Sequence, residues 1–329
     1  MTRQPLLLAI DGGQTSTKSL LAASNGQILA TGLGGPSDHF HSAGGIERNR
    51  TAILGAASQA LASANAAPED VVAIALGLTG VHLASGEGMV VEEIARALMP
   101  NANVRVVQDY VTNLAGASAG KPGVVVVAGG GAISYGVTAD GREALSNGFG
   151  YMIGDEGSGY DIGRQAIAAA ARASDGRGPD TLLNSLICSA FGIEKIRQVT
   201  RVVYHADFRR DRISRLAPLV VKAARQEDEV ALSILVRAGS DLAVSALAVI
   251  HRLHQPGDPV GVYPTGGVFT AGKLILQTFR ETIQADWSTA AVHTPAFPPT
   301  VGGLILAAQH QNLEIDDAWL DGVRATLPK

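Results

Sequence analysis

Two apolar segments that each end in a glycine-rich turn, about 120 residues apart, constrain the fold of this chain most. Residues 6–10 lead into the turn at 11–18, and residues 123–128 lead into the turn at 129–134. Each pattern predicts a buried strand, a tight turn and a second strand. A turn with little side-chain bulk lets backbone N–H groups approach phosphate oxygens closely, and the hydroxyls of residues 15–17 can add donors. Two such turns facing each other across a cleft would bind a triphosphate from both sides.

The sequence that follows each turn is repeated as well. A hairpin is predicted around Asn25-Gly26, and a similar one around Asp140-Gly141. This weak repeat is typical of a duplicated domain. Further interior strands are predicted at 71–78, 103–107 and 260–264. Alanine-rich segments with helical spacing are predicted to cover the sheets at 46–66, 88–98, 161–174, 212–224, 229–253 and 303–311.

Composition limits the class of protein. A chain of 329 residues with 46% apolar and 17% charged residues is globular and long enough for two domains. The glycine-rich stretch at 116–123 marks the boundary, which gives an N-terminal domain of residues 1–118 and a C-terminal domain of 119–329. The net charge of −4 gives no reason to expect nucleic acid or an anionic membrane as partner. The first apolar segment is too short for a signal peptide or a membrane span, so we expect a cytoplasmic protein.

Carboxylates follow two of the predicted strands. Asp11 directly precedes the first glycine pair. The carboxylate of Asp11 would repel a phosphate bound at this turn unless a cation lay between the two negative charges. Asp11 is therefore predicted to be a Mg²⁺ ligand. A carboxylate that caps its own turn is the alternative. Asp109 follows the strand at 103–107, at a strand end where α/β proteins place catalytic groups. It could accept a proton from a substrate hydroxyl, or it could cap the helix that follows.

Residues 148–159 contain five glycines, which is typical of a loop that approaches a ligand closely. Asp155 in this loop could bind sugar hydroxyls, with Phe149 or Tyr151 as an apolar wall. Alternatively, Asp155 and Glu156 could interact with the dipole of the next helix, an alternative that is stronger for Glu156 than for Asp155.

A second loop, residues 34–39, could bring Asp38 to a substrate in the cleft. His39 and His41 lie in the same region, but no convincing third ligand completes a zinc site.

Together these segments resemble the N-acetylglucosamine kinases, a branch of the actin, sugar-kinase and Hsp70 superfamily also described as BadF-type ATPases. The turn at 11–18 resembles the first phosphate motif, 129–136 the second, and 266–267 the adenosine motif. The loop at 148–163 is the most specific match. The resemblance, which extends from end to end, implies an α/β fold of two duplicated actin-like (ribonuclease H-like) domains with a cleft between them. It also implies that the last helix returns to the N-terminal domain.

The resemblance further implies a function. It implies a homodimeric kinase that uses ATP and Mg²⁺ to phosphorylate the 6-hydroxyl of an amino sugar, N-acetylglucosamine first and glucosamine as the alternative. Asp109 would be the catalytic base and Asp11 would support Mg²⁺. The implied ATP-binding residues are Gly12, Gly13, Gln14, Thr15, Lys18, Gly129, Gly130, Gly131, Gly266 and Gly267. The implied substrate-binding residues are Ser37, Asp38, Asp109, Gly148, Phe149, Gly150 and Asp155.

Two positions depart from the family pattern. The second phosphate motif usually reads Gly-Thr-Gly-Ser, whereas residues 129–132 are Gly-Gly-Gly-Ala. Backbone donors remain without the hydroxyls, so looser ATP binding is expected. Asp38 stands where the family commonly has Asn, and its negative charge would favour a free ammonium group over an acetamido group.

Two other functions compete with the kinase. The ATPase activators of 2-hydroxyacyl-CoA dehydratases share the fold but supply two cysteines per chain to an iron–sulfur cluster, whereas Cys188 is the single cysteine here. A non-catalytic amino-sugar sensor would explain the missing hydroxyls. The retained Asp11, Asp109 and Asp155 argue against the sensor.

Overall fold

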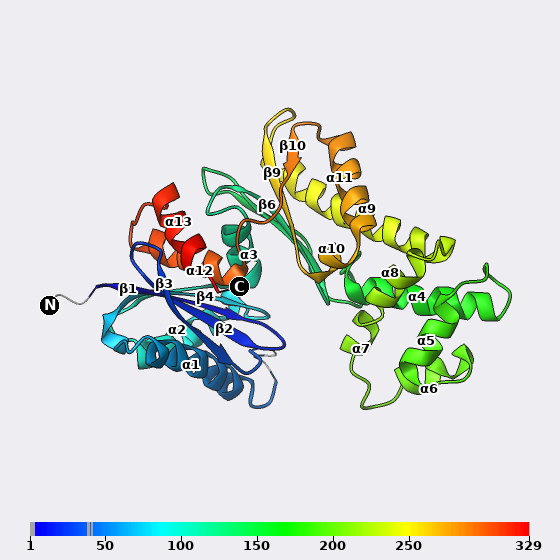
Figure 1. Cartoon of the computed structure of the whole chain (residues 1–329), viewed down its shortest axis with the longest axis horizontal. Coiled ribbons are helices and arrows are strands. Elements are labelled where there is room, and N and C mark those ends of the chain that lie inside the picture. The colour runs from blue at the N-terminus through cyan, green and yellow to red at the C-terminus, as the bar shows by residue number, and fades with distance from the viewer. Residues whose placement is uncertain (1–3, 38–39, 41, 329) are drawn as a thin grey trace. The chain divides into compact units, whose positions relative to one another are not determined.

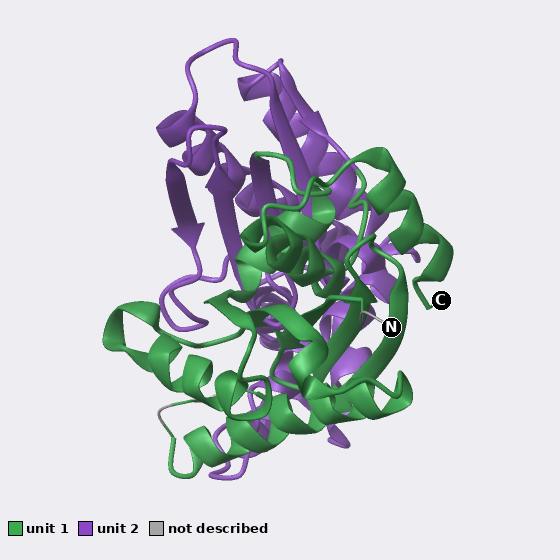
Figure 2. Ribbon diagram, turned by 90° about the vertical axis from the view of Figure 1, so that its left-hand side faces the viewer, with its two compact units in different colours: residues 1–122, 294–329 green, residues 123–293 purple. Residues whose placement is uncertain are grey.

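Two mixed five-stranded sheets, one in each of two units, form the framework of the computed structural model, which describes residues 4–37, 40 and 42–328 (Figure 1). Unit 1 comprises residues 1–122 and 294–329, and unit 2 comprises residues 123–293 (Figure 2). The strands of unit 1 are β1 (Leu6–Gly12), β2 (Thr17–Ala23), β3 (Ile28–Gly34), β4 (Val71–Leu78) and β5 (Asn103–Gln108). Those of unit 2 are β6 (Gly123–Ala128), β7 (Ala132–Val137), β8 (Glu143–Asn147), β9 (Val260–Thr265) and β10 (Ala290–Val292).

The two sheets have the same topology. Their strand orders are β3-β2-β1-β4-β5 and β8-β7-β6-β9-β10, with an antiparallel three-stranded meander followed by two parallel strands in each. The predicted duplication and the α/β class are therefore confirmed. In both sheets the glycine turn joins the first two strands of the meander.

The sheet of unit 1 is covered on both faces because its central strands are apolar on both sides. Leu8 and Ile10 of β1 belong to one core cluster, whereas Leu7 and Ala9 belong to another, as expected for side chains that alternate along a strand. The helices of this unit are α1 (Gly45–Ser63), α2 (Glu87–Leu98), α3 (Asp109–Ala117), α12 (Pro299–His310) and α13 (Asp317–Thr326), with 3₁₀ turns at Pro68–Asp70 and Leu83–Ser85.

Unit 2 is richer in helices. They are α4 (Gly159–Ser174), α5 (Leu183–Phe191), α6 (Val199–Val203), α7 (Asp211–Ser214), α8 (Ala217–Ala224), α9 (Glu229–Leu253), α10 (Gly267–Ala271) and α11 (Lys273–Asp286), with a 3₁₀ turn at Ile196–Gln198. The single helix predicted over 212–224 is divided into α7 and α8, because Pro218 has no N–H with which to continue the helical hydrogen bonds. By length and composition alone α9 could cross a membrane, but most of its apolar segment is buried in the core of unit 2.

The division of the chain by contacts falls after Pro122, whereas the predicted boundary follows residue 118. The segment that returns to unit 1 begins at Thr294 and contains both α12 and α13, not the last helix alone. It is held there by backbone hydrogen bonds from Ala296 and Phe297 to the C-terminal end of α3 and by the packing of α12 on α3.

The packing of α12 on α3 depends on Gly302. A Cβ atom at this position would lie 1.9 Å from the carbonyl oxygen of Thr112 and 2.5 Å from the amide nitrogen of Gly116. We expect Gly302→Ala to lower the free energy of unfolding by roughly 1–3 kcal/mol, measured by thermal and urea denaturation. Gly55→Ala is the matched control, because a Cβ at this exposed helical glycine meets nothing within 4 Å. A similar loss of stability in both variants would contradict this account of the α3–α12 contact.

Candidate active site

The first phosphate turn joins β1 to β2. The Gly13 N–H donates to the carbonyl oxygen of Ser16 at 3.1 Å and closes the turn, which leaves residues 14–15 exposed at its tip. The Thr17 hydroxyl donates to the carbonyl oxygen of Gly35 at 2.9 Å, so it holds the neighbouring loop and the prediction that it is a free donor is wrong.

Gly12 allows the next loop to approach this turn. A Cβ at Gly12 would lie 2.4 Å from both the Leu78 side chain and the Ser37 hydroxyl oxygen, and the Ser37 N–H donates to the carbonyl oxygen of Gly13 at 3.0 Å. The Ser37 side chain is fully buried, and within the described residues its hydroxyl has no hydrogen-bond partner. Asp38 lies outside the described residues, so its role in substrate binding stays a prediction.

Asp11 and Asp109 form a pair of carboxylates at the ends of β1 and β5. The pKa of Asp11 is raised to about 6, first by burial and then by the negative charge of Asp109. The positive charge of Lys18, the cross-strand partner of Asp11 in β2, lowers the pKa and so opposes this rise. Burial also raises the pKa of Asp109. The alternative role for Asp11 was to cap its own turn by accepting a hydrogen bond from a turn N–H. No such hydrogen bond occurs among the residues that the structure describes, which disfavours this role.

The surroundings of Asp109 fix its orientation. Gln108 occupies the N-cap position and Asp109 is the first residue of α3, so the prediction of Asp109 as the cap is wrong. One carboxylate oxygen, Oδ2, accepts a hydrogen bond from the Thr79 hydroxyl at 2.6 Å. Thr79 was not predicted from the sequence, although its place directly after the buried strand β4 is a signal that could have identified it.

The chemistry of this carboxylate pair fits Mg²⁺. Two neighbouring carboxylates with one opposing lysine favour a cation, and Mg²⁺ is usually held by one or two carboxylates together with water and substrate phosphates. No cluster of three or more acidic, histidine or cysteine ligands occurs among the residues that the structure describes. Two carboxylates supply only part of the octahedral shell of Mg²⁺, so water and phosphate oxygens would supply the other ligands.

The second phosphate turn joins β6 to β7. The Gly129 N–H donates to the carbonyl oxygen of Gly131 at 2.9 Å, and the carbonyl oxygen of Gly129 accepts from the Gly159 N–H at 2.8 Å. This second bond links the turn to the start of α4. A Cβ at Gly129 or Gly130 would meet nothing within 4 Å, so that side of the turn is open to a ligand.

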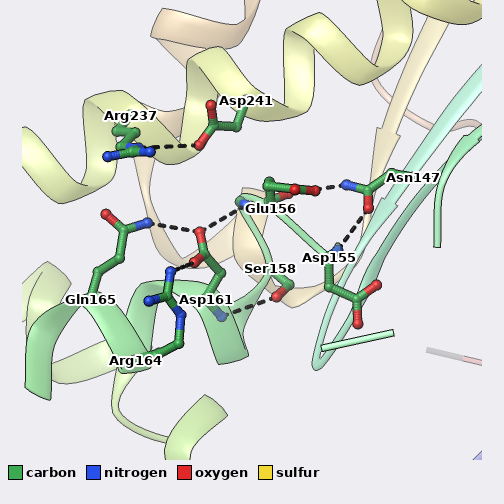
Figure 3. Close-up of polar contacts among 10 residues, drawn as sticks. Asn147, Asp155, Glu156, Ser158, Asp161, Arg164, Gln165, Arg237 and Asp241 are labelled. Carbon is green, nitrogen blue, oxygen red and sulfur yellow. Dashed lines mark hydrogen bonds and ion pairs between the residues drawn. The ribbon is translucent and has the colours of Figure 1, made fainter. Parts of the chain in front are cut away.

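Asp155 lies directly against this turn. Its Oδ1 accepts a hydrogen bond from the Ala132 N–H at 3.3 Å, and a Cβ at Gly131 would lie 2.9 Å from its Oδ2. Burial raises the pKa of Asp155. Its backbone is left-handed, with φ of 63°, and Asn147 supports it by accepting the Asp155 N–H at 2.7 Å (Figure 3). Asn147 was not predicted as a site residue, and the only signal for its role is the Asn-Gly pair at the start of the loop.

The remainder of the loop serves the fold. Ser158 is the N-cap of α4 and follows Asp155 and Glu156 directly in the chain, so the helix-dipole alternative for these two residues stays a prediction. The acidic residue in the first turn of α4 is Asp161, which accepts hydrogen bonds from the Gly157 N–H, Arg164 and Gln165 (Figure 3).

The aromatic side chains of this loop differ in their surroundings. Phe149 is 73% exposed, whereas Tyr151 packs edge-on against Tyr160 and beneath the guanidinium of Arg210, at 5.0 Å from the ring centroid. The Arg210 charge also lowers the pKa of Asp155 against the effect of burial. Tyr151 is therefore held between Tyr160 and Arg210.

Gly266 and Gly267 connect β9 to α10. Gly266 has φ of 95°, and a Cβ there would lie 2.3 Å from the carbonyl oxygen of Ala128 at the end of β6. A Cβ at Gly267 would meet nothing within 4 Å. The pair thus lies beside the second phosphate turn within unit 2, and its part in adenosine binding stays a prediction.

Comparisons with known proteins show what the chain is similar to. A model of the BadF/BadG/BcrA/BcrD ATPase family matches residues 8–307. An N-acetylmuramic acid/N-acetylglucosamine kinase of Clostridium acetobutylicum is 28% identical, over 92% of this chain and 97% of its own. An N-acetyl-D-glucosamine kinase of Dictyostelium discoideum is 26% identical with the same coverage. A crystal structure from Chromobacterium violaceum, of a protein proposed to be an N-acetylglucosamine kinase, is 29% identical with a TM-score of 0.73, over 93% of this chain and 99% of its own.

Proposed function

Because the chain belongs to the BadF/BadG/BcrA/BcrD ATPase family, we propose that it is an ATP-dependent kinase that phosphorylates the 6-hydroxyl of N-acetylglucosamine. The observation that carries the proposal is the carboxylate pair beside the first glycine turn, with Asp109 oriented by Thr79. The names of the relatives in Clostridium and Dictyostelium support the substrate.

The residues divide the chemistry between them. Asp109 accepts the proton of the sugar hydroxyl as its oxygen attacks the γ-phosphorus of ATP, and ADP leaves. Asp11 supports Mg²⁺, which when bound neutralises phosphate charge. The backbone N–H groups at the tips of the two turns, at residues 14–15 and 130–131, hold phosphate oxygens in place, so positioning supplies most of the rate enhancement.

Asp155 has a supporting role in this proposal. Asn147 accepts its backbone N–H, the Ala132 N–H donates to its carboxylate, and the remaining lone pairs of the carboxylate can accept hydrogen bonds from sugar hydroxyls. Ser37, whose buried hydroxyl has no partner within the described residues, is a second candidate for contact with the sugar. We further propose that the protein acts as a cytoplasmic homodimer.

A substrate panel tests the proposal. ATP-dependent release of ADP is measured for the purified chain with N-acetylglucosamine, N-acetylmuramic acid, glucosamine and glucose, with and without Mg²⁺. We expect N-acetylglucosamine to have the highest kcat/KM and turnover to require Mg²⁺. A preference for glucosamine would replace the substrate and keep the kinase. Sugar binding without turnover of any of the four would overturn the kinase and favour the sensor.

A further inference from the structure

Thr79 connects the proposed catalytic base to the first phosphate turn. Its hydroxyl donates to Asp109 Oδ2 at 2.6 Å, and its backbone N–H donates to the carbonyl oxygen of Gly12 at 2.9 Å. One residue therefore contacts both the carboxylate that would take the proton and the backbone that would hold the phosphates.

The elements on either side make this connection rigid. Thr79 directly follows β4, which lies between β1 and β5 in the sheet, and Asp109 directly follows β5. Gly12 pairs with Leu78 in the β1–β4 register, so the Thr79 N–H extends the hydrogen bonding of these parallel strands by one step. The backbone of Thr79 thus has little freedom, and its β-branched side chain has few rotamers.

We propose that Thr79 is a positioning residue for phosphoryl transfer: its hydroxyl holds Asp109 Oδ2 so that Oδ1 is presented to the substrate hydroxyl. The inference rests on the proposed function, because it needs Asp109 to be the base. It goes beyond that function in assigning a role to a residue that does not touch the substrate. A hydrogen bond to a charged carboxylate is among the stronger ones in proteins, so its loss should be measurable in the chemical step.

The test compares two substitutions at this position. Thr79→Val keeps the shape of the side chain but removes the donor, and we expect kcat to fall roughly 10- to 100-fold with KM for the sugar within about threefold of wild type. Thr79→Ser keeps the donor, and we expect kcat within about fivefold of wild type. Thr326→Val is the matched control, because it removes a threonine hydroxyl of unit 1 whose hydrogen bonds, in the part of the chain that the structure describes, are to the backbone of Ile28 and Gly322.

A double-mutant cycle separates positioning from loss of structure. In the Asp109→Asn background, Thr79→Val should change the residual kcat less than about twofold, because the base it positions is gone. Three outcomes would overturn the inference. They are an unchanged kcat in Thr79→Val, an equal fall of kcat in Thr79→Val and Thr79→Ser, and a fall of kcat in the Asp109→Asn background as large as in the wild-type background. The proposed function fails separately, if wild-type protein turns over no amino sugar or if Asp109→Asn stays active.

Discussion

Replacing Asp109 with Asn is expected to lower kcat about 1,000-fold, within the range that a general base contributes to enzymatic proton transfer. The side chain keeps its shape, and the Asn Oδ1 can still accept the Thr79 hydroxyl, so the geometry around α3 should persist. The amide cannot take the proton of the sugar hydroxyl. We therefore expect binding of the sugar and of ATP to stay within about threefold of wild type.

The kinetic constants of this variant are measured with a coupled assay for ADP, and binding is measured by calorimetry. Asn113→Asp is unsuitable as a control because Asn113 bonds to the Asp109 carbonyl. Asp70→Asn, a change from Asp to Asn in a 3₁₀ turn outside the site, is suitable and should leave kcat unchanged. Activity of Asp109→Asn close to wild type would show that the proton leaves by another route.

Replacing Asp11 with Asn is expected to lower kcat more than about 100-fold and to stabilise the fold at the same time. Burial and the Asp109 charge raise the pKa of Asp11 from 3.8 to about 6. The folded protein therefore holds this proton more tightly than the unfolded chain, and its stability falls as the pH rises from about 4 to about 6. Asn carries no charge, so it avoids a cost of up to about 3 kcal/mol at pH 7 in metal-free protein.

This second prediction is checked by urea denaturation of both proteins in the presence of EDTA at pH 4 and pH 7. The gain in stability from Asp11→Asn should be large at pH 7 and small at pH 4. A variant that is less stable at pH 7, or one that keeps wild-type Mg²⁺ dependence of turnover, would contradict the role given to Asp11.

The fold was largely predictable because its signals are local. Apolar runs identified β1, β4, β5, β6 and β9, and the glycine turns and hairpin signals that follow β1 and β6 identified the duplication. The return of residues 294–329 to unit 1 was harder to predict from the sequence. It depends on the close contact of Gly302 with α3, and a glycine in an alanine-rich helix does not show in sequence which helix it packs against.

The candidate site was predictable where a residue's type alone suggests its chemistry. Asp11 and Asp109 stand at strand ends, and parallel strands bring such ends together. The roles of Thr79 and Asn147 depend on hydrogen bonds to residues 30 and 8 positions away, respectively. No spacing rule reveals such pairs. For the same reason, the position of Asp155 against Gly131 and Ala132 required the structure.

The position of the phosphate on the product tests the central claim most directly. Wild-type protein is incubated with ATP, Mg²⁺ and N-acetylglucosamine, and the product is examined by ¹H–³¹P correlation NMR, beside the Asp109→Asn variant. The account predicts a single sugar phosphate, coupled to the protons at carbon 6, formed in equal amount to ADP and absent from the variant. Release of ADP without a sugar phosphate, or phosphate on another hydroxyl, would contradict it.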